Sequence, residues 1–412
     1  MGKVYIATCA FNAEKTIKRC VESVLHQSFA DFVYYLCDNA STDQTGKIIE
    51  QYAARDKRIV PSHNKTNHDW SENLEYALLP HTISEEDYFC LLDADDELAW
   101  TFFEEMLLFL KKENLDMVVC GNDFVNSANG KLTNVRQAEH SVVLQDAEGF
   151  SKYFSFYYQF MRTGWAKVYS GKIAHKRYAY SQYPPEFPKA YGGDTYNVFR
   201  CLREAQRVGI YSKSLYRYYL SPDSVSHRFH PQRVECDRIL HEDAVDFLKT
   251  KCGVVSPKNL DFLFGVYMNA LIDTSHVLLS AKIDLGQKLD HLREMMDCAY
   301  TRQLAARENF GDVLDAGPEL RERRKAHFRA VADWLLTLQE VPDGQVESFC
   351  DMGEFACAAA EHAEGWVFFN KLRIRLLIDQ GRAEEGRAKL GELEEVLPGD
   401  ADLAAFRAQL PQ

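Results

Sequence analysis

The stretch YFCLLDADDELAW, residues 88–100, begins as a run of large apolar residues and then places three aspartates, Asp93, Asp95 and Asp96, within four positions. A short apolar run that ends in polar residues is typical of a buried strand. Carboxylates this close together repel one another and raise each other's pKa, unless a cation or a set of donors compensates them. The stretch therefore predicts a buried strand that ends at a site for positive charge.

Around this strand, apolar runs alternate with amphipathic stretches. Strands are expected at VYIATCAF, FVYYLC, RIV and DMVVCGNDF, and helices at residues 14–27, 45–56, 70–79 and 101–114. This alternation predicts an α/β fold with a mostly parallel sheet flanked by helices. Ligands of such sheets collect at the carboxyl ends of the strands, so the residues directly after each strand form the candidate site.

The sequence changes character near residues 229–232, where we expect a domain boundary. Residues 1–230 carry the α/β pattern, and residues 231–412 are almost wholly helical and strongly charged, which predicts an all-α C-terminal domain. Its end, LLIDQGRAEEGRAKLGELEEVLPGD, is interpreted as a helical hairpin with a turn at Gly381, and only a few positions resemble a tetratricopeptide repeat. Apolar stripes such as FLFGVYMNALIDTSHVLL favour homo-oligomerisation through this half.

Composition restricts the class of protein. The 412 residues are 46% hydrophobic and 26% charged, as in a soluble globular protein, and the net charge of −13 argues against nucleic acid as a partner. The eleven cysteines form no CxxC pair, which indicates a reducing, cytoplasmic compartment. The chain shows no signal peptide and no apolar stretch of about 18 residues, so membrane association is expected to be peripheral at most.

The aspartate cluster has the chemistry of a metal site. Asp93 and Asp95 place two carboxylates at alternate positions, and hard oxygen ligands of this type suit Mg²⁺ or Mn²⁺. A cation bound by one or two carboxylates keeps positions open for water and substrate phosphates. A helix N-cap before TFFEEMLLFL is the structural alternative.

Three further motifs accompany LDADD (residues 92–96). The first strand runs into CAFN (9–12), the next helix ends in SVLHQS (23–28), and the second strand ends in CDNASTD (37–43). In this order, over residues 3–228, the motifs resemble those of the inverting glycosyltransferases of family 2, whose nucleotide-binding fold is called GT-A. The resemblance covers over half of the chain.

The resemblance implies a nucleotide-diphosphate sugar as donor, with a UDP-sugar expected, and a glycan or lipid-linked acceptor in surface polysaccharide synthesis. It implies a hexosyl or N-acetylhexosaminyl transfer. Asn39 stands where many relatives carry a second aspartate, which leaves uracil and thymine both open. The residues implied at the nucleotide or the metal are Cys9, Phe11 (beside the base), Asn12, Asp38, Asn39, Asp93, Ala94 and Asp95 (on the metal).

The same resemblance implies a general base at Asp194, in GGDTYNVFRCL, which would take the proton of the acceptor hydroxyl. Gly193 stands where members of the family carry another acid, and a helix N-cap is the alternative role for Asp194. Many members bind the diphosphate with an arginine after the third strand. This chain offers Lys65, His63 and His68 there, with a solvated loop as the alternative.

Two later segments complete the resemblance. In GWAKVYSGKI, Trp165 would stack on an acceptor sugar and Lys167 would approach phosphate, with a place in the core as the alternative for Trp165. In SPDSVSHRFH, His227 would join the metal ligands and Arg228 would contact the diphosphate.

Other functions remain as alternatives. A sugar nucleotidyltransferase shares the α/β plan, but TCAFNAE has no glycine to hold a triphosphate. A catalytically degenerate scaffold would act through its helical half as a binding or assembly protein, and the intact DAD and Asp194 argue against it. A glycosidase needs two carboxylates but leaves the nucleotide-like turns unexplained.

Overall fold

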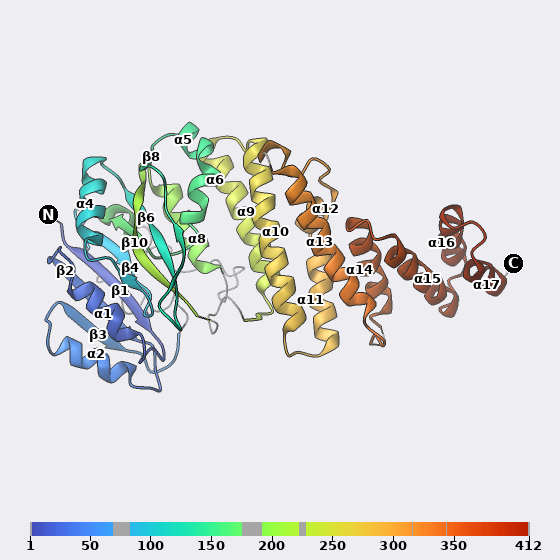
Figure 1. Ribbon diagram of the computed structural model, residues 1–412, viewed down its shortest axis with the longest axis horizontal. Helices are drawn as coiled ribbons and strands as arrows, with labels where there is room; N and C mark the ends of the chain where they lie inside the picture. The colour runs from blue at the N-terminus through green and yellow to red at the C-terminus, as the bar shows by residue number, and fades with distance from the viewer. Residues whose placement is uncertain are drawn as a thin grey trace. The chain divides into compact units, whose positions relative to one another are not determined.

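The computed structural model describes residues 2–68, 83–174, 192–221, 228–314, 316–342 and 344–410, so the helix predicted at 70–79 and the residue His227 lie outside the described residues. The chain divides into two compact units (Figure 1). The first comprises Met1–His227 and Ile239–Asn259, and the second comprises Arg228–Arg238 and Leu260–Gln412. The chain therefore passes from the first unit to the second, back to the first and again to the second between residues 227 and 260. The single domain boundary expected near residues 229–232 stays a prediction.

The first unit is built on a ten-stranded sheet in the order β3-β2-β1-β4-β9-β6-β10-β5, with β7 paired to β6 and β8 to β10. The strands are β1 (Val4–Ala10), β2 (Phe32–Asp38), β3 (Ile59–His63), β4 (Tyr88–Leu91), β5 (Glu97–Leu98), β6 (Met117–Asn126), β7 (Leu132–Arg136), β8 (Val142–Leu144), β9 (Lys167–Ser170) and β10 (Val208–Leu220).

The predicted α/β class is confirmed, but the sheet is more mixed than expected. Strands β3, β2, β1 and β4 are parallel, and β6 is parallel to β10. Strand β9 runs antiparallel to both of its neighbours, and β5, β7 and β8 also pair antiparallel. The repeated strand–helix units at the start of the chain force parallel pairing there, because a crossover helix returns each strand in the same direction.

The described helices of the first unit are α1 (Ile17–Leu25), α2 (Thr45–Ala53), α4 (Phe102–Lys112), α5 (Ala147–Lys152), α6 (Phe154–Tyr157), the 3₁₀ turn η1 (Tyr158–Phe160), α8 (Gly193–Glu204) and α9 (Arg233–Cys252), which extends from the second unit. Helix α1 buries Ile17, Cys20, Val21 and Val24, the spacing of one helical face. In α4, acidic residues begin the helix and lysines end it, which suits the helix dipole.

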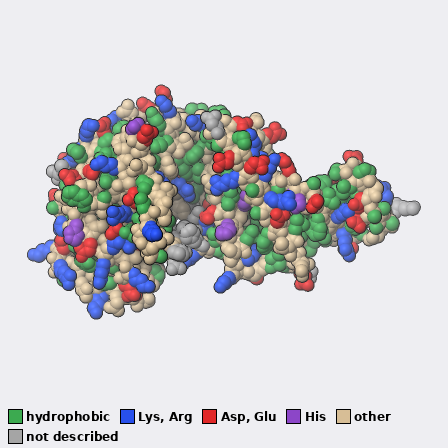
Figure 2. Space-filling view, in the orientation of Figure 1, with side chains coloured by type: hydrophobic (Ala, Val, Ile, Leu, Met, Phe, Trp, Pro, Cys, Tyr) green, Lys and Arg blue, Asp and Glu red, His purple; other side chains and the backbone are tan. Residues whose placement is uncertain are grey.

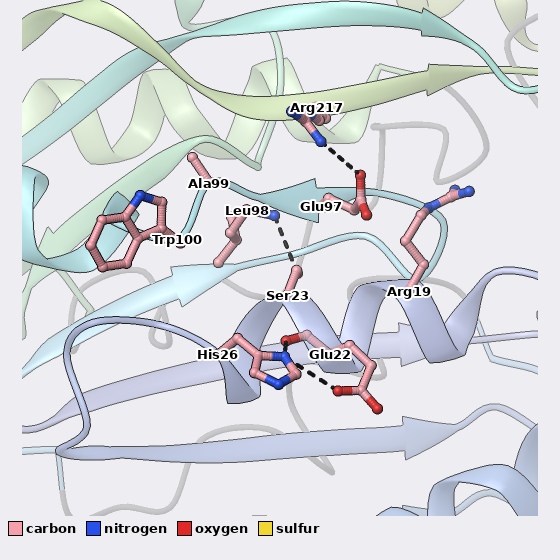
Figure 3. A pocket seen from close by; sticks show the side chains of 9 residues that line it. All are labelled: Arg19, Glu22, Ser23, His26, Glu97, Leu98, Ala99, Trp100 and Arg217. Atoms are coloured by element: carbon pink, nitrogen blue, oxygen red, sulfur yellow. Dashed lines mark hydrogen bonds and ion pairs between the residues drawn. The ribbon is translucent and has the colours of Figure 1, made fainter. Parts of the chain in front are cut away.

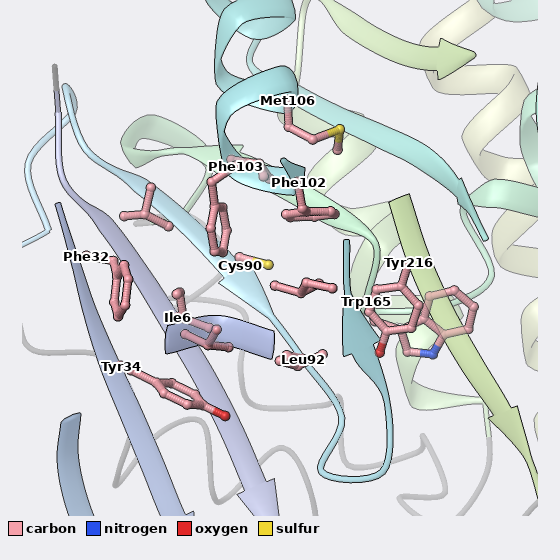
Figure 4. Packing of buried hydrophobic residues seen from close by; sticks show 14 of the residues in the cluster. Ile6, Phe32, Tyr34, Cys90, Leu92, Phe102, Phe103, Met106, Trp165 and Tyr216 are labelled. Carbon is pink, nitrogen blue, oxygen red and sulfur yellow. The ribbon is translucent and has the colours of Figure 1, made fainter. Parts of the chain in front are cut away.

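One core joins these helices to the sheet. Side chains from α1, α2 and α4 pack with alternate residues of β1, β2 and β4, as Figure 4 shows for Ile6, Phe32 and Phe103. A separate set of buried rings connects α5, α6, α8 and α9 through Phe150, Phe154, Phe199 and Phe247. The core formed with α1, α2 and α4 thus holds the parallel strands in place.

The second unit is helical, as predicted. Its helices are α10 (Pro257–Ser280), α11 (Leu285–Asp297), α12 (Ala299–Ala306), the 3₁₀ turn η3 (Asp312–Leu314), α13 (Gly317–Leu336), α14 (Val346–Ala359), α15 (Ala363–Asp379), α16 (Ala383–Val396) and α17 (Ala401–Gln409). Most of these helices pack around one hydrophobic core. The last three, α15 to α17, form a small second core around Ile374, Leu390 and Leu403. The turn predicted at Gly381 is confirmed, with a left-handed φ of 71°.

Two surface properties bear on partners. By length and composition, α10 is long and apolar enough to cross a membrane. Half of its apolar 18-residue stretch is nevertheless buried inside the protein, as in the core helices of soluble proteins. This helix carries the stripe that the sequence analysis assigned to self-association. On the face shown in Figure 2, Lys and Arg side chains are interspersed with Asp and Glu.

Candidate functional site

The predicted site residues of the first two strands meet at one edge of the sheet. In the parallel register, Ala10 lies opposite Asp38 and Asp38 lies opposite His63. The backbone N–H of Leu92 donates to the carbonyl of Ala7 at 3.0 Å, which places the start of the aspartate cluster beside β1. Sequence segments as far apart as Ala7 and Leu92 thus share the carboxyl ends of neighbouring strands, as predicted.

The turn after β1 is bonded to the turn after β2. Asn12 has a left-handed φ of 49°, and its side-chain oxygen accepts from the backbone N–H of Thr42 at 2.9 Å. Its own backbone N–H donates to Ser41 Oγ, also at 2.9 Å. In the next residue, Ala13 donates its N–H to Thr45 Oγ1 at 2.8 Å. Asn12 and the Ser41–Thr45 segment are therefore bound to each other, and a direct nucleotide contact by Asn12 stays a prediction.

Asp38 forms a relay with a histidine. Its Oδ2 lies 3.2 Å from His63 Nδ1, and His63 Nε2 lies 2.6 Å from Glu50 Oε1. The hydrogen bond to Glu50 and the charge of Asp38 raise the pKa of His63, against the effect of its partial burial. Gly46 is packed against this pair, since a Cβ there would stand 2.5 Å from Asp38 Oδ2. The relay thus places an imidazole with a raised pKa between two carboxylates at the edge where the sequence showed no arginine.

The Asn39 amide organises the loop after β3. Its Nδ2 donates to Asn67 Oδ1 and to the His68 carbonyl, at 2.7 and 2.8 Å. Its Oδ1 accepts from Asn64 Nδ2 and from the His68 backbone N–H, at 2.9 and 3.0 Å. The buried side chain thus has its donors and acceptor engaged within the protein, and a contact with a base stays a prediction.

Other predicted nucleotide contacts are accessible. Phe11 is 48% exposed, which leaves its ring free of the core. Lys65 is exposed on the loop after β3.

Cys9, another predicted nucleotide contact, lies opposite Cys37 in the register of β1 and β2. The hydrogen bond between these thiols lowers the pKa of Cys37 to about 7 and raises that of Cys9.

The three clustered aspartates have different surroundings. Asp96 is fully buried and accepts from Tyr216 O–H at 2.8 Å and from the Tyr219 backbone N–H at 2.9 Å. Its own N–H donates to the Asp93 carbonyl at 3.2 Å, which closes the turn. These donors tie Asp96 to β10 and partly offset burial and the charges of Asp93 and Asp95, which together raise its pKa well above the usual value.

Among the described residues, the Asp93 carboxylate accepts no hydrogen bond, and the Asp95 carboxylate accepts one from its own backbone N–H. Burial raises the pKa of Asp93 well above its usual value, and the charges of Asp194 and Asp95 raise it further. The Asp95 side chain is exposed to solvent. The protein atoms around its carboxylate nevertheless raise its pKa, whereas the positive charge of Arg19 lowers it. This part of the turn is an acidic site that a cation would stabilise.

Asp194 is brought to the same acidic site. It lies in the first turn of α8, two positions after Gly192, which has a left-handed φ of 75° and caps the helix. A Cβ on Gly192 would stand 2.6 Å from Leu240 Cδ1, so backbone conformation and space both favour glycine. The N-cap position expected as the alternative role of Asp194 is taken by Gly192.

The acidic site fits a divalent cation with few protein ligands. In the described part of the chain, which leaves out His227, no group of three or more His, Cys, Asp or Glu side chains is arranged to hold a metal. Asp93 and Asp95 alone match the use of one or two carboxylates for Mg²⁺, with substrate phosphates and water as the other ligands. Burial, and after it the charges of Asp194 and Asp95, raise the pKa of Asp93, and a bound cation would oppose this shift.

Two predicted acceptor-side residues are buried. Trp165 is 6% exposed and stacks on Tyr216 and Tyr218, with centroids 4.6 and 5.2 Å apart, and this packing favours the core position that the sequence also allowed. Lys167 is fully buried in β9, and its ammonium donates to the carbonyls of Thr163 and Trp165 at 2.6 and 3.1 Å. The sugar-stacking role of Trp165 and the phosphate contact of Lys167 stay predictions.

Two predicted residues, Arg228 and His227, remain. Arg228 is exposed and belongs to the second unit, so its contact with a diphosphate stays a prediction. His227, proposed as a metal ligand, falls outside the described residues.

Sequence reasoning missed Arg19, on α1. Its guanidinium donates to the carbonyl of Asp95 and lies over the ring of Tyr219, 3.5 Å from the centroid. It thus connects α1, the aspartate turn and β10. No local pattern marks it, because its partners lie 76 and 200 residues further along the chain.

Comparisons with known proteins agree with this architecture. The model of the family described as "Glycosyl transferase family 2" matches residues 5–183. Over 118 residues the chain is 36% identical to EpsE of Bacillus subtilis, whose own assignment as a glycosyltransferase is provisional. Over 115 residues it is 30% identical to WfaP of Escherichia coli, named as a UDP-Glc:alpha-D-GlcNAc-diphosphoundecaprenol beta-1,3-glucosyltransferase.

Each alignment covers 28% of this chain, and 41% of EpsE or 44% of WfaP, so the chain spans less than half of either relative. Among solved structures, the S. aureus TarS fragment 1–349 in complex with UDP-GlcNAc aligns with 90% of this chain and 91% of its own, at 15% identity and a TM-score of 0.44. A TM-score of this size carries no inference about function.

Proposed function

We propose that this chain transfers a sugar from a nucleotide-diphosphate donor to a hydroxyl group, with inversion at the anomeric carbon. Residues 5–183 are a glycosyl transferase family 2 domain with a GT-A fold, and the chain is therefore a glycosyltransferase. A UDP-sugar is the proposed donor. The proposed acceptor is a glycan or lipid-linked sugar in the synthesis of a bacterial surface polysaccharide or teichoic acid.

One observation carries the proposal. Asp93 and Asp194, which are 101 positions apart, are close enough for the charge of one to raise the pKa of the other. The fold thus places a strand-end carboxylate and a helix-start carboxylate in one acidic site. An inverting transfer needs these two functions together, namely a place for the donor diphosphate with its cation and a base for the acceptor.

The donor would lie along the edge formed by β1, β2 and β4. The exposed ring of Phe11 is available as a platform for the base. The turn that holds Asn12 against Thr42 keeps this platform in one position. His63, with its raised pKa, and exposed Lys65 supply positive charge near the end of β3, where the diphosphate would lie.

Asp194 would act as the base. Its place in the first turn of α8 fixes it beside Asp93, and the glycine before it lets the chain approach closely. The Asp194 carboxylate would take the proton of the acceptor hydroxyl as its oxygen attacks the anomeric carbon from the face opposite the diphosphate. A positioned base of this kind contributes about 10²- to 10⁴-fold.

Asp93 and Asp95 would hold Mg²⁺ or Mn²⁺. When bound, such a cation stabilises the negative charge that develops on the leaving diphosphate. Its presence would also keep Asp93 and Asp95 ionised, because a bound cation favours the charged form of a carboxylate.

The proposed acceptor and location rest on relatives and on composition. WfaP is named for transfer from UDP-Glc to GlcNAc-diphosphoundecaprenol, and this name supports a lipid-linked acceptor here. Eleven cysteines without a CxxC pair support the cytoplasm, with peripheral contact at the inner face of the membrane where such an acceptor would be met.

We further propose that copies of the chain associate through the helical unit. Its exposed apolar side chains include Phe368 on α15 and Val396 on α16. Light scattering of the full chain tests this, and a monomeric mass at micromolar concentration would contradict it.

Calorimetric titration of UDP, GDP and dTDP, each with and without Mn²⁺, tests the main proposal. We expect one nucleotide, UDP, to bind in a metal-dependent manner to the unmodified protein. Asp95→Ala should lose the metal dependence. Asp31→Ala is the matched control, because Asp31 carries an exposed carboxylate of the same unit away from the aspartate turn. Binding that keeps its full metal dependence in Asp95→Ala would refute the metal site, and failure of every nucleotide to bind would favour a degenerate scaffold.

A further inference from the structure

A pocket lies on the first unit between α1 and the β5 segment. It has a volume of about 460 Å³, within the range of small-molecule sites. Figure 3 shows Trp100 and Arg19 at opposite ends of the group, with Glu22 and His26 from α1 and Arg217 from β10 between or beside them. None of these residues belongs to the proposed donor site.

Trp100 is the most exposed large apolar side chain among the described residues, at 66%. Its backbone is nevertheless fixed. The Ser28 N–H donates to the Trp100 carbonyl at 2.9 Å, and Gln27 Nε2 donates to the Ala99 carbonyl at 2.7 Å. The Ala99 N–H donates to Leu215 on β10 at 2.9 Å. The backbone that carries the indole is therefore already ordered, so a ligand has to order only the side chain of Trp100.

Arg217 and His26 are paired with carboxylates in this pocket, whereas Arg19 contacts a backbone carbonyl. Arg217 lies 3.7 Å from Glu97, which also accepts from Tyr219 O–H at 2.5 Å. His26 Nδ1 lies 3.3 Å from Glu22 Oε2 on the same helix. Arg19, the second arginine, faces the Asp95 carbonyl. With two arginines and two glutamates, the pocket has no excess charge to attract an anion.

This combination defines the ligand. A phosphate group would need unpaired cations, and an amphipathic helix of a partner would need a broad apolar face, whereas this pocket has one indole among charged and hydroxyl groups. A sugar ring presents C–H bonds on its face and hydroxyls around its edge. The face suits Trp100, and the hydroxyls suit the carboxylates, guanidinium and Ser23 hydroxyl that line the same pocket.

We infer that the pocket between α1 and β5 binds a neutral sugar ring, with Trp100 as the stacking surface and Glu22, Glu97 and Arg217 as hydrogen-bonding groups. The site is additional to the donor site. If the proposed function holds, its occupant is a sugar unit of the acceptor glycan away from the reacting end. Arg19 then connects the occupied pocket to the backbone of Asp95.

The test uses the full chain labelled with 5-fluorotryptophan and ¹⁹F NMR. The chain has five tryptophans, and Trp100→Phe assigns the Trp100 signal. Glucose, galactose and N-acetylglucosamine are titrated separately at millimolar concentrations, with inorganic phosphate as the anionic comparison. We expect at least one sugar to shift the Trp100 signal saturably while the Trp165 signal stays in place.

A second titration uses Trp100→Ala and measures sugar binding by calorimetry. Loss of the stacking surface should weaken binding by roughly tenfold, the effect of about 1.4 kcal/mol. Leu132→Ala is the matched control, because Leu132 is also exposed in this unit and lies on β7 outside the pocket. Equal weakening in both variants would overturn the assignment.

The outcomes separate this inference from the proposed function. No shift at Trp100 with any of the three sugars, or a saturable shift with phosphate alone, would overturn the sugar site. UDP binding with Mn²⁺, measured on the same samples, reports on the donor site independently. A protein that binds UDP but leaves Trp100 unmoved by sugars keeps the proposed function and loses the pocket.

Discussion

Trp165→Ala tests whether this residue belongs to the core or to the substrate site. The indole is 6% exposed and stacks nearly parallel to Tyr216 and Tyr218, at interplanar angles of 10° and 18°. Replacing a buried tryptophan by alanine removes its contacts and leaves a cavity, at a loss of about 3–5 kcal/mol. In a unit of this size each kcal/mol lowers the Tm by roughly 2–4 °C, so the transition of the first unit should fall by roughly 6–20 °C.

Differential scanning calorimetry of the full chain measures this shift. Trp100→Ala is the matched control, because the same substitution at a residue 66% exposed should change stability by no more than about 0.5 kcal/mol. Equal shifts in the two variants would refute the reasoning from burial. A Trp165→Ala protein that kept its Tm but lost sugar transfer would support the stacking role that the sequence suggested.

Three further predictions use other features. Gly192→Ala should destabilise the first unit by about 1–3 kcal/mol, since it forces a left-handed φ and a Cβ against Leu240; thermal melts check this, and an unchanged Tm would contradict it. Asp194→Asn should lower the transfer rate by about 10²- to 10⁴-fold with UDP affinity retained, and a rate within threefold or so of the unmodified enzyme would exclude Asp194 as the base. Burial lowers the pKa of His327 to about 4, so the unfolded chain binds a proton between about pH 6.5 and 4 that the folded chain does not. Stability should therefore fall as the pH drops through this window, by about 3 kcal/mol in all, and urea titrations of His327→Asn should show a shallower decline; parallel curves for the two proteins would contradict the assignment.

The parallel part of the sheet could be predicted because its signals are local. Each of β1, β2 and β4 is an apolar run followed by polar residues, and each is joined to the next by an amphipathic stretch. Strand ends then predict which residues share an edge, as the register of Asp38 beside Ala10 and His63 confirms. The antiparallel position of β9 between β4 and β6 could not be predicted, since it depends on pairing between distant segments.

The side-chain roles divide in the same way. Asp93, Asp95 and Asp194 are polar residues at element ends, and their meeting follows from topology. The burial of Trp165 and Lys167 depends on residues such as Tyr216 that lie some 50 positions away, and GWAKVYSGKI is equally compatible with a core strand or a ligand wall. Asn39 shows the same difficulty, because only the folded loop reveals that its amide is already bonded to Asn64 and His68.

The aspartate cluster contains two solutions to one electrostatic problem. Burial and the charges of Asp93 and Asp95 raise the pKa of Asp96, and hydrogen bonds from a tyrosine hydroxyl and a backbone N–H of β10 partly offset this effect. Asp93 faces Asp95 and Asp194 instead, and each neighbouring carboxylate makes its ionised form less favourable. If only the structure of the turn mattered, one aspartate would suffice, because Asp96 already ties the turn to β10. The repulsion at Asp93 is thus a cost that folding alone does not require, and it is the reason to expect that a cation and a phosphate group complete this edge.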